Sequence, residues 1–201
     1  MGRPKIHDDA LRGRLIDQAA ALVFDGGVDA LNLRRLAADA GTSTSAVYSL
    51  FGNKAGLLES LYLEAARRFG ARLGEVAPSD DPVDDIVRLG IAYRDYALRE
   101  PRLYAIMFAL HTAEVDDCAR DEAAETIAPL VDAVRRGQDA GALRKVAPEL
   151  VALSCWGVAH GLVSLELAGS LPPGLDVAVG YEVALTAMID GWRQSIVHSP
   201  K

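Results

Sequence analysis

The sequence has few of the residues that build disulfide frameworks, metal centres or strands. Its two cysteines, Cys118 and Cys155, stand far apart and outside any C-x-x-C pair. This spacing argues against a disulfide scaffold or a zinc site and predicts two buried free thiols. Aromatic residues make up 6% of the chain, and no stretch alternates polar and apolar residues as a half-buried strand does. The composition therefore predicts an all-α protein without a bound metal.

Catalytic and phosphate-binding motifs are also missing. The chain has no glycine-rich phosphate loop, no H-E-x-x-H and no G-x-S-x-G. His111 and His160 are candidate bases and Cys155 is a candidate nucleophile, so a small helical enzyme stays as one alternative. Trp156 and His160 are four residues apart, which favours a packed pair on one helix. We predict a protein that is not an enzyme and that needs no cofactor.

Long hydrophobic runs are scarce. The first residues hold no apolar segment of the kind found in a secretory signal. The longest uncharged run lies between Glu149 and Glu166, is shorter than a typical membrane span and contains Ser154 and His160. These features predict a cytoplasmic protein with no membrane partner.

The charge is unevenly distributed along the chain. The formal net charge is −7, yet residues 1–55 carry a net +1 and residues 56–201 a net −8. A near-neutral N-terminal module therefore precedes an acidic remainder, which permits binding of nucleic acid at one end.

Residues 33–51 predict two short helices joined by a tight turn. The first helix has one apolar stripe at helical spacing, formed by Leu33, Leu36, Ala37 and Ala40. Gly41 follows, where a left-handed residue commonly ends a helix, and Thr42 or Ser43 can cap the next one. In that second helix Val47, Leu50 and Phe51 form the inward stripe, while Thr44, Ser45 and Tyr48 point outward. This arrangement is typical of a helix-turn-helix.

Lys54 stands at the predicted start of the next helix, behind Asn53 as its N-cap. A cation there opposes the helix dipole, unless a phosphate bound at the helix end makes it a favourable contact. The helix continues to about Val76 and leaves the N-terminal bundle. The sequence thus divides into a helix-turn-helix domain at 1–55, a linking helix at 54–76 and a second domain at 78–201.

The second domain is also helical. A predicted helix over 118–139 contains Pro129, so it is kinked or broken there. A helix over roughly 149–169 is apolar nearly all round, and the last helix has an apolar stripe from Tyr181 through Trp192 to Ile196. One subunit cannot easily cover both of these helices, so we predict a homodimer that pairs the two C-terminal helices of each subunit in a four-helix bundle.

Residues 8–60 resemble the DNA-binding domain of TetR-family transcriptional regulators. The resemblance is carried by Leu36-Ala-Ala-Asp-Ala-Gly41, Ser45-Ala-Val-Tyr-Ser-Leu-Phe51 and Gly52-Asn-Lys-Ala-Gly-Leu-Leu58. It implies a double-stranded DNA operator as partner, with these DNA-binding residues: Asn32, Arg34, Ser43, Thr44, Ser45, Tyr48 and Lys54. The second helix departs from many relatives because it has no Arg or Lys, so thymine methyl groups and phosphates are its expected contacts rather than guanine.

The C-terminal part resembles the family branch marked by a Trp–His–Gly signature, here Trp156, His160 and Gly161, with Pro101–Phe108 as a second match. This resemblance implies a dimeric regulator, usually a repressor, that leaves a palindromic operator when a small-molecule effector binds. Concentration of aromatic residues predicts an effector pocket formed by Tyr93, Tyr96, Tyr104, Met107, Phe108, Trp156 and His160. The other alternative is a helical scaffold that binds protein instead of DNA.

Overall fold

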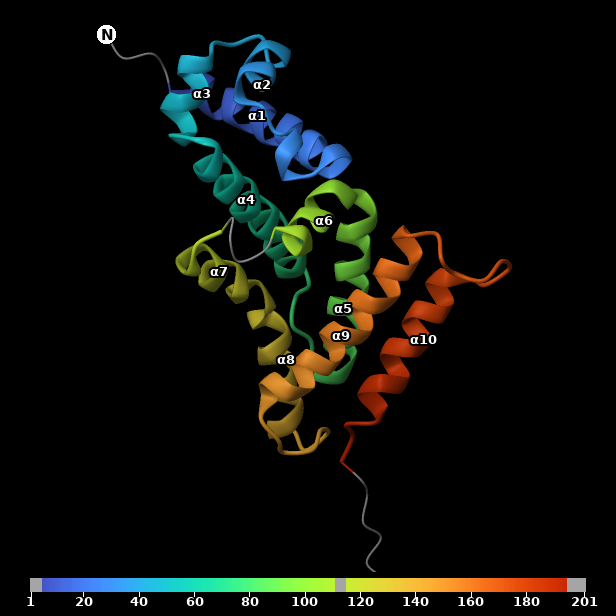
Figure 1. The fold of residues 1–201 in the computed structure, drawn as a ribbon. Helices are drawn as coiled ribbons and strands as arrows, with labels where there is room; N and C mark the ends of the chain where they lie inside the picture. Colours follow the sequence, from blue (N-terminus) through green and yellow to red (C-terminus); the bar gives the residue numbers. More distant parts are fainter. Residues whose placement is uncertain (1–4, 111–114, 195–201) are drawn as a thin grey trace, which may run out of the picture. The chain divides into compact units, whose positions relative to one another are not determined.

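The computed structural model describes residues 5–110 and 115–194, and within these ranges the chain is helical (Figure 1). No strand forms there, and the pairing of Leu143 with Arg193 is an isolated bridge. The predicted all-α class is confirmed. The α-helices are α1 (Lys5–Gly26), α2 (Leu33–Asp39), α3 (Thr44–Phe51), α4 (Lys54–Gly74), α5 (Pro82–Arg99), α6 (Pro101–Ala109), α7 (Asp117–Ala124), α8 (Ala128–Asp139), α9 (Pro148–Leu167) and α10 (Val177–Asp190).

Contacts group the chain into two compact units. The first unit holds the residues up to Arg68 together with Glu100–Ala124, and the second holds Phe69–Arg99 with the residues from Glu125 onward. Helix α4 contributes its first part to one unit and its last turns to the other. Helix α6 (Pro101–Ala109) thus packs with the N-terminal helices, although the sequence places it in the range 78–201. The division by function, at 1–55 and 78–201, stays a prediction.

The first unit is built on α1. Helix α2 packs against α1 and α3, and α6 packs along α1. Leu15 and Ile16 of α1, Leu36 of α2 and Val47 of α3 are fully buried. Leu36 and Val47 belong to the apolar stripes that the sequence predicts for α2 and α3, and their burial holds both helices against the unit.

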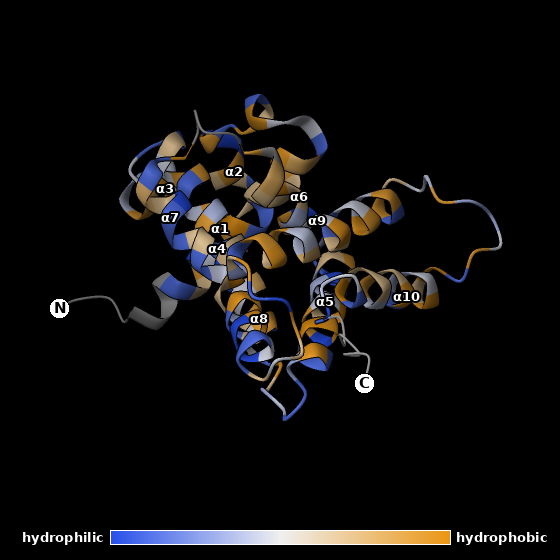
Figure 2. Cartoon of the chain, turned by 90° about the horizontal axis from the view of Figure 1, so that it is seen from below, coloured by the Kyte–Doolittle hydropathy of each residue, from blue (hydrophilic) through white to orange (hydrophobic). Residues whose placement is uncertain are grey.

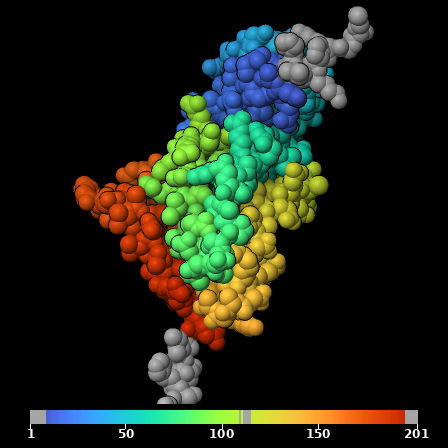
Figure 3. Space-filling view, turned by 180° about the vertical axis from the view of Figure 1, so that it is seen from behind, coloured from blue at the N-terminus to red at the C-terminus, as the bar shows by residue number. Residues whose placement is uncertain are grey.

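The second unit is a bundle of α5, α8, α9 and α10. Helix α5 contacts the other three, and α9 packs between α8 and α10. In the space-filling view the red α10 forms one edge of this unit (Figure 3). Its buried stripe, Tyr181, Leu185 and Ile189, faces the bundle.

Several boundaries differ from the sequence expectations. The helix predicted over 118–139 is broken, one of the two outcomes expected from Pro129, but the 3-10 turn lies at Glu125–Ile127. Pro129 itself lies in the first turn of α8, where no N–H is needed. Helix α10 ends at Asp190, so Trp192 lies beyond it, and its indole N–H donates to Ser154 Oγ at 2.8 Å. Ile196 lies outside the described residues. Cys155 is buried as expected, but Cys118 is exposed.

Helix α9 is long and apolar enough, by length and composition, to cross a membrane, and it is the one such helix in the described ranges. It is not buried all round in the single chain, because only 28% of its apolar stretch is covered. Its buried residues, among them Val151, Cys155 and Val163, recur at helical spacing and face the bundle. On the opposite side, Leu150, Leu153 and Leu165 are exposed in the described part of the chain.

Candidate nucleic-acid interface and ligand cavity

The turn between α2 and α3 has the geometry of a helix-turn-helix. Gly41 has φ +64° and ends α2, and the N–H of Thr42 reaches back to the carbonyl of Ala37 at 2.9 Å. Ser43 then caps α3, because its Oγ accepts from the N–H of Ala46 at 3.1 Å. Asn32 caps α2 by accepting from two backbone N–H groups at 3.0 and 3.1 Å. Gly41 and Ser43 take the structural roles that the sequence predicts for them.

Helix α3 separates an inner face from an outer one. Val47 and Phe51 are buried against the first unit. Tyr48 is 51% exposed although it is a large aromatic residue, and Ser45 is also exposed, while Thr44 is half-buried. An exposed aromatic side chain beside small hydroxyl side chains is a surface suited to a phosphate backbone and to base edges.

Lys54 opens α4 directly after a tight turn. Gly52 has φ +73°, and Asn53 Oδ1 accepts from the N–H of Gly56 at 2.9 Å, which caps the helix as predicted. A Cβ at Gly56 would lie 2.2 Å from the carbonyl oxygen of Phe51, so only glycine fits this turn. This requirement escapes sequence reasoning, because it depends on how closely α4 approaches the end of α3.

Arg34 and Arg35 differ in whether their positive charge is paired with a carboxylate of the protein. Arg35 pairs with Asp39 at 3.6 Å, four residues along the same helix. Arg34 is exposed and forms no ion pair within the part of the chain that the structure describes. Arg12, which the sequence did not single out, lies over the ring of Phe51 with its guanidinium carbon 5.6 Å from the ring centroid.

The seven predicted DNA-binding residues therefore lie on consecutive elements of one unit. Asn32 and Arg34 belong to the start of α2, Ser43 to Tyr48 to the turn and α3, and Lys54 to the first position of α4. They combine three helix N-termini, two basic side chains and a row of hydroxyl groups, which are features suited to binding an anion. Their roles on DNA remain a prediction.

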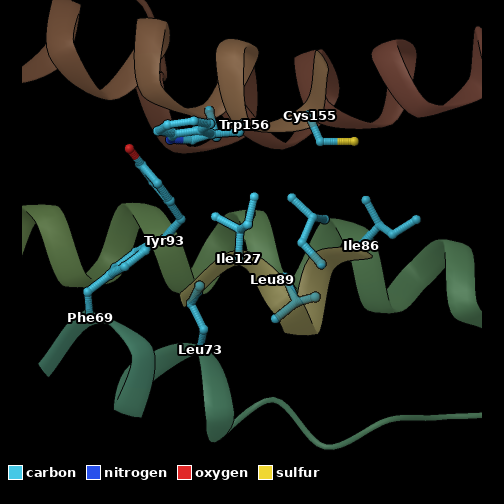
Figure 4. A pocket seen from close by; sticks show the side chains of 11 residues that line it. Phe69, Leu73, Ile86, Leu89, Tyr93, Ile127, Cys155 and Trp156 are labelled. Carbon is cyan, nitrogen blue, oxygen red and sulfur yellow. The ribbon is translucent and has the colours of Figure 1, made fainter. Parts of the chain in front are cut away.

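A cavity opens inside the second unit, and Figure 4 shows its walls. The space not filled by atoms is about 390 Å³, counted with the solvent at its mouth, and the centre of a water molecule can occupy about 30 Å³ of it. The lining residues come from α4 (Phe69, Leu73), α5 (Ile86, Leu89, Gly90, Tyr93), the segment before and into α8 (Ile127, Leu130) and α9 (Cys155, Trp156, Ala159).

The structure divides the seven residues predicted for an effector pocket. Tyr93 and Trp156 line the cavity, and His160 Nδ1 lies 3.0 Å from the Tyr93 hydroxyl. Tyr96 is buried with its ring centroid 5.3 Å from that of Phe69. The other three, Tyr104, Met107 and Phe108, lie on α6 in the first unit and do not line this cavity.

Burial shifts the pKa of two groups that the sequence offers as catalytic candidates. Burial raises the pKa of the Cys155 thiol to about 12, so the thiolate that a nucleophile requires is not formed near neutral pH. Burial lowers the pKa of His160 below its ordinary value. His111 lies outside the described residues. Among those described, no group of three His, Cys, Asp or Glu side chains could hold a metal ion.

Comparisons with known proteins identify the family. Residues 15–61 match the model for bacterial regulatory proteins of the tetR family, and residues 86–188 match that for the tetracyclin repressor-like C-terminal domain. The chain is 29% identical over 182 residues to the HTH-type transcriptional repressor SCO4008 of Streptomyces coelicolor, covering 84% of this chain and 88% of that protein.

Solved structures agree in fold. A protein of unknown function from Rhodococcus sp. RHA1 is 26% identical, with a TM-score of 0.79 over 92% of this chain and 96% of its own. A TetR-family transcription regulator from Marinobacter aquaeolei VT8 is 22% identical, with a TM-score of 0.80, and the match covers 95% of this chain and 100% of that chain. The resemblance predicted from the sequence is confirmed. The chain belongs to the TetR family and is a DNA-binding transcriptional regulator.

Proposed function

We propose that this regulator is a cytoplasmic repressor that binds a palindromic operator as a homodimer and is released when a small molecule enters its second unit. The observation that carries the proposal is the exposed side of α3, where Ser45 and Tyr48 lie opposite the buried Val47. The half-buried Lys54 follows at the first position of α4. Release by an effector is the general mechanism of the family to which the chain belongs.

The α3 helix enters the major groove in this proposal. Ser45 and Tyr48 are exposed on it, and Thr44 stands at its first turn. Since α3 carries no Arg or Lys, its specificity comes from thymine methyl groups, hydroxyl contacts and the shape of the groove. Guanine-specific bidentate contacts are not expected from this helix.

Phosphate contacts come from the residues that frame α3. Lys54 and Arg34 supply positive charge, beside the N-termini of α4 and α2. The Asn32 Oδ1 and Ser43 Oγ atoms already accept backbone hydrogen bonds as caps. These two residues therefore act on phosphate as donors, Asn32 through its NH₂ group and Ser43 through its O–H.

The dimer forms through α9 and α10. Hydrophobic residues, coloured orange, recur along both helices (Figure 2), and several of them are exposed in the single chain. Its large exposed side chains are Leu150, Leu153 and Leu165 of α9 and Val179 and Val183 of α10. Gly157 and Gly161 lie on the exposed side of α9, and a Cβ at either would meet nothing within 4 Å. A partner helix can approach closely there, as in a packed four-helix bundle.

The effector site is the cavity of the second unit. Phe69 and Leu73, which line it, belong to the same helix that begins with Lys54. A molecule that fills the cavity therefore touches the helix whose other end carries a DNA contact. A ligand that binds more tightly when α4 takes a different position shifts the protein toward that state, and affinity for the operator falls. The fall can be no larger than the ratio of the ligand's affinities for the two states of the protein.

The test is a footprint and a gel shift on the DNA upstream of the protein's own gene. We expect protection of two half-sites about 34–36 Å apart, or somewhat more, and at least tenfold weaker binding by Tyr48→Ala. Phe24→Ala, which removes another exposed aromatic side chain of the first unit, is the control and keeps full affinity. Failure to bind any DNA at low salt would favour the protein-binding scaffold instead.

A further inference from the structure

Arg12 of α1 lies against the last residue of α3. Its guanidinium carbon is 5.6 Å from the centroid of the Phe51 ring. Phe51 is only 7% exposed and Arg12 is half-buried, so the ring is largely covered while part of the arginine still reaches solvent. A guanidinium that stacks on an aromatic ring keeps its charge but loses much of its freedom to move. Phe51 therefore restricts where this positive charge lies.

The charge of Arg12 is not matched by a carboxylate of the protein. Within the part of the chain that the structure describes, the Arg12 side chain has no ion pair and no hydrogen bond, and its contact is the ring of Phe51. By contrast, Arg68 of the same unit pairs with both Asp17 and Glu64. A guanidinium has five N–H donors in one plane, and stacking on a ring leaves their edges free. An acceptor from outside the protein can therefore meet them.

This arginine lies at the end of the surface proposed to bind DNA. Phe51 follows the exposed Tyr48 by about one turn of α3, and Lys54 opens α4 three residues later. Arg12 thus places a second cation close in the fold to the turn between α3 and α4. The planar fork of a guanidinium matches two oxygens of a phosphate, with which it forms paired, charge-assisted hydrogen bonds.

We propose that Arg12 binds a phosphate of the operator, so that α1 contributes to the DNA interface together with α2, α3 and α4. This inference rests on the proposed docking of α3 and the start of α4 on DNA, and it adds a contact from a helix to which the sequence assigned none. Phe51 is the positioning residue, because its ring holds the guanidinium in place. The contact carries no base specificity, since phosphates are the same in every sequence.

The salt dependence of binding tests the contact, measured by fluorescence anisotropy with a labelled duplex from the DNA upstream of the protein's own gene. Arg12→Ala should weaken binding about tenfold. It should also lower the slope of log binding constant against log salt by about two in the dimer, whereas Arg12→Lys, which keeps the charge, retains the slope. Arg14→Ala is the matched control. Arg14 is an exposed arginine two residues along α1, on the opposite side of the helix, and its loss should change neither quantity.

A purely structural Arg12 would give a different result. If its role is only to cover the ring of Phe51, Arg12→Ala lowers the melting temperature but leaves the salt slope unchanged, and that result overturns the proposal. Arg12→Gln is the second variant, because it keeps a polar chain over the ring without the charge. It should lower the slope as Arg12→Ala does, and it provides the measurement if Arg12→Ala does not fold.

Ethylation interference identifies the phosphate, because ethylation removes the charge that Arg12 would meet. In each half-site one phosphate should interfere with binding of the wild-type protein but not of Arg12→Ala, and it should differ from the phosphate lost in Lys54→Ala. An unchanged pattern and slope for Arg12→Ala, with a reduced slope for Lys54→Ala, overturns this inference alone. Unchanged slopes for both variants, or no binding of the duplex at low salt, would refute the proposed docking as well.

Discussion

Asp85 is the buried charge on which the path of the chain between α4 and α5 depends, so its replacement is the most informative stability test. Asp85 is 1% exposed, and its carboxylate accepts from the Ser79 N–H at 2.9 Å, the Ser79 hydroxyl at 2.6 Å and Arg136 Nη2 at 2.6 Å. Arg88 also donates to it. The same two arginines donate to the carbonyls of Ala77 and Ser79, each at 3.1 Å. Asp85 therefore fastens this loop to α5 and α8.

Asp85→Ala removes the acceptor of all four hydrogen bonds. Breaking a buried ion pair by removing one partner costs about 3–5 kcal/mol, but Arg88 and Arg136 are more than one third exposed and water can solvate them. We therefore expect the free energy of unfolding to fall by about 2–3 kcal/mol. Urea unfolding at fixed protein concentration measures this as a lower midpoint with unchanged slope.

Asp84→Ala is the matched control. Asp84 pairs with the same Arg88 at 2.9 Å, yet it is 59% exposed, so its loss should lower the free energy of unfolding by less than about 1 kcal/mol. Equal destabilisation by Asp84→Ala and Asp85→Ala would refute the reasoning, because burial would then make no difference.

The pH dependence gives the same test a second readout. Burial alone would raise the pKa of Asp85, but hydrogen bonds from Ser79 and Arg136 and the charge of Arg88 lower it by more, and the pKa lies well below its ordinary value. The unfolded chain then binds the proton more readily than the folded one. The stabilisation is complete above about pH 4–5 and is lost as the pH falls toward the folded pKa. Asp85→Asn should flatten this acid limb of the stability curve.

Three further predictions concern the dimer face and the helix ends. Gly157→Leu and Val183→Glu should each shift the protein from dimer to monomer in sedimentation, and a dimer retained by both would disprove the α9–α10 interface. Asn32→Ala should lower the free energy of unfolding by about 1 kcal/mol through loss of the α2 cap, and no change in the urea midpoint would show that the cap is dispensable. Gly56→Ala should lower the melting temperature, because its Cβ would lie 2.2 Å from the carbonyl oxygen of Phe51. Gly13→Ala, in open space within α1, should raise the melting temperature, and the opposite order of the two variants would contradict this geometry.

Local chemistry explains why the helix-turn-helix could be predicted. Caps such as Asn32, Ser43 and Asn53 bond to N–H groups two or three residues away, and Gly41 takes a backbone conformation that its own lack of a side chain permits. None of these features depends on a distant part of the chain. The sequence therefore contains all the information that places them.

The cavity could not be predicted in the same way, because its walls come from four separate segments. Tyr93 and Tyr104 are near in sequence and both lie in apolar stripes at helical spacing. Helix α5 nevertheless ends before Pro101, and α6, which carries Tyr104, packs on α1 in the other unit. Nothing in the spacing of the aromatic residues shows that Phe69 and Ile127 are the partners of Tyr93. Which apolar stripes meet is a property of the tertiary packing.

The length of α10 shows the same limit. Helical spacing continues through Trp192, but the helix ends at Asp190, and Trp192 instead bonds to Ser154 and lies under Arg144, whose guanidinium carbon is 4.9 Å from the ring centroid. Tertiary contacts of Trp192 thus replace the last helical turn, and the spacing of apolar residues in the sequence does not predict such contacts.

The salt dependence of operator binding tests the central claim, docking of α3 and the start of α4 on DNA, most directly. The logarithm of the binding constant should fall linearly with the logarithm of salt concentration, with a slope of about 0.9 for each phosphate neutralised. Fluorescence anisotropy should show that Lys54→Ala weakens binding and lowers this slope by about two in the dimer, while Lys145→Ala, an exposed lysine of the second unit, changes neither. Identical slopes and affinities for both variants would contradict the docking of α4 against a phosphate.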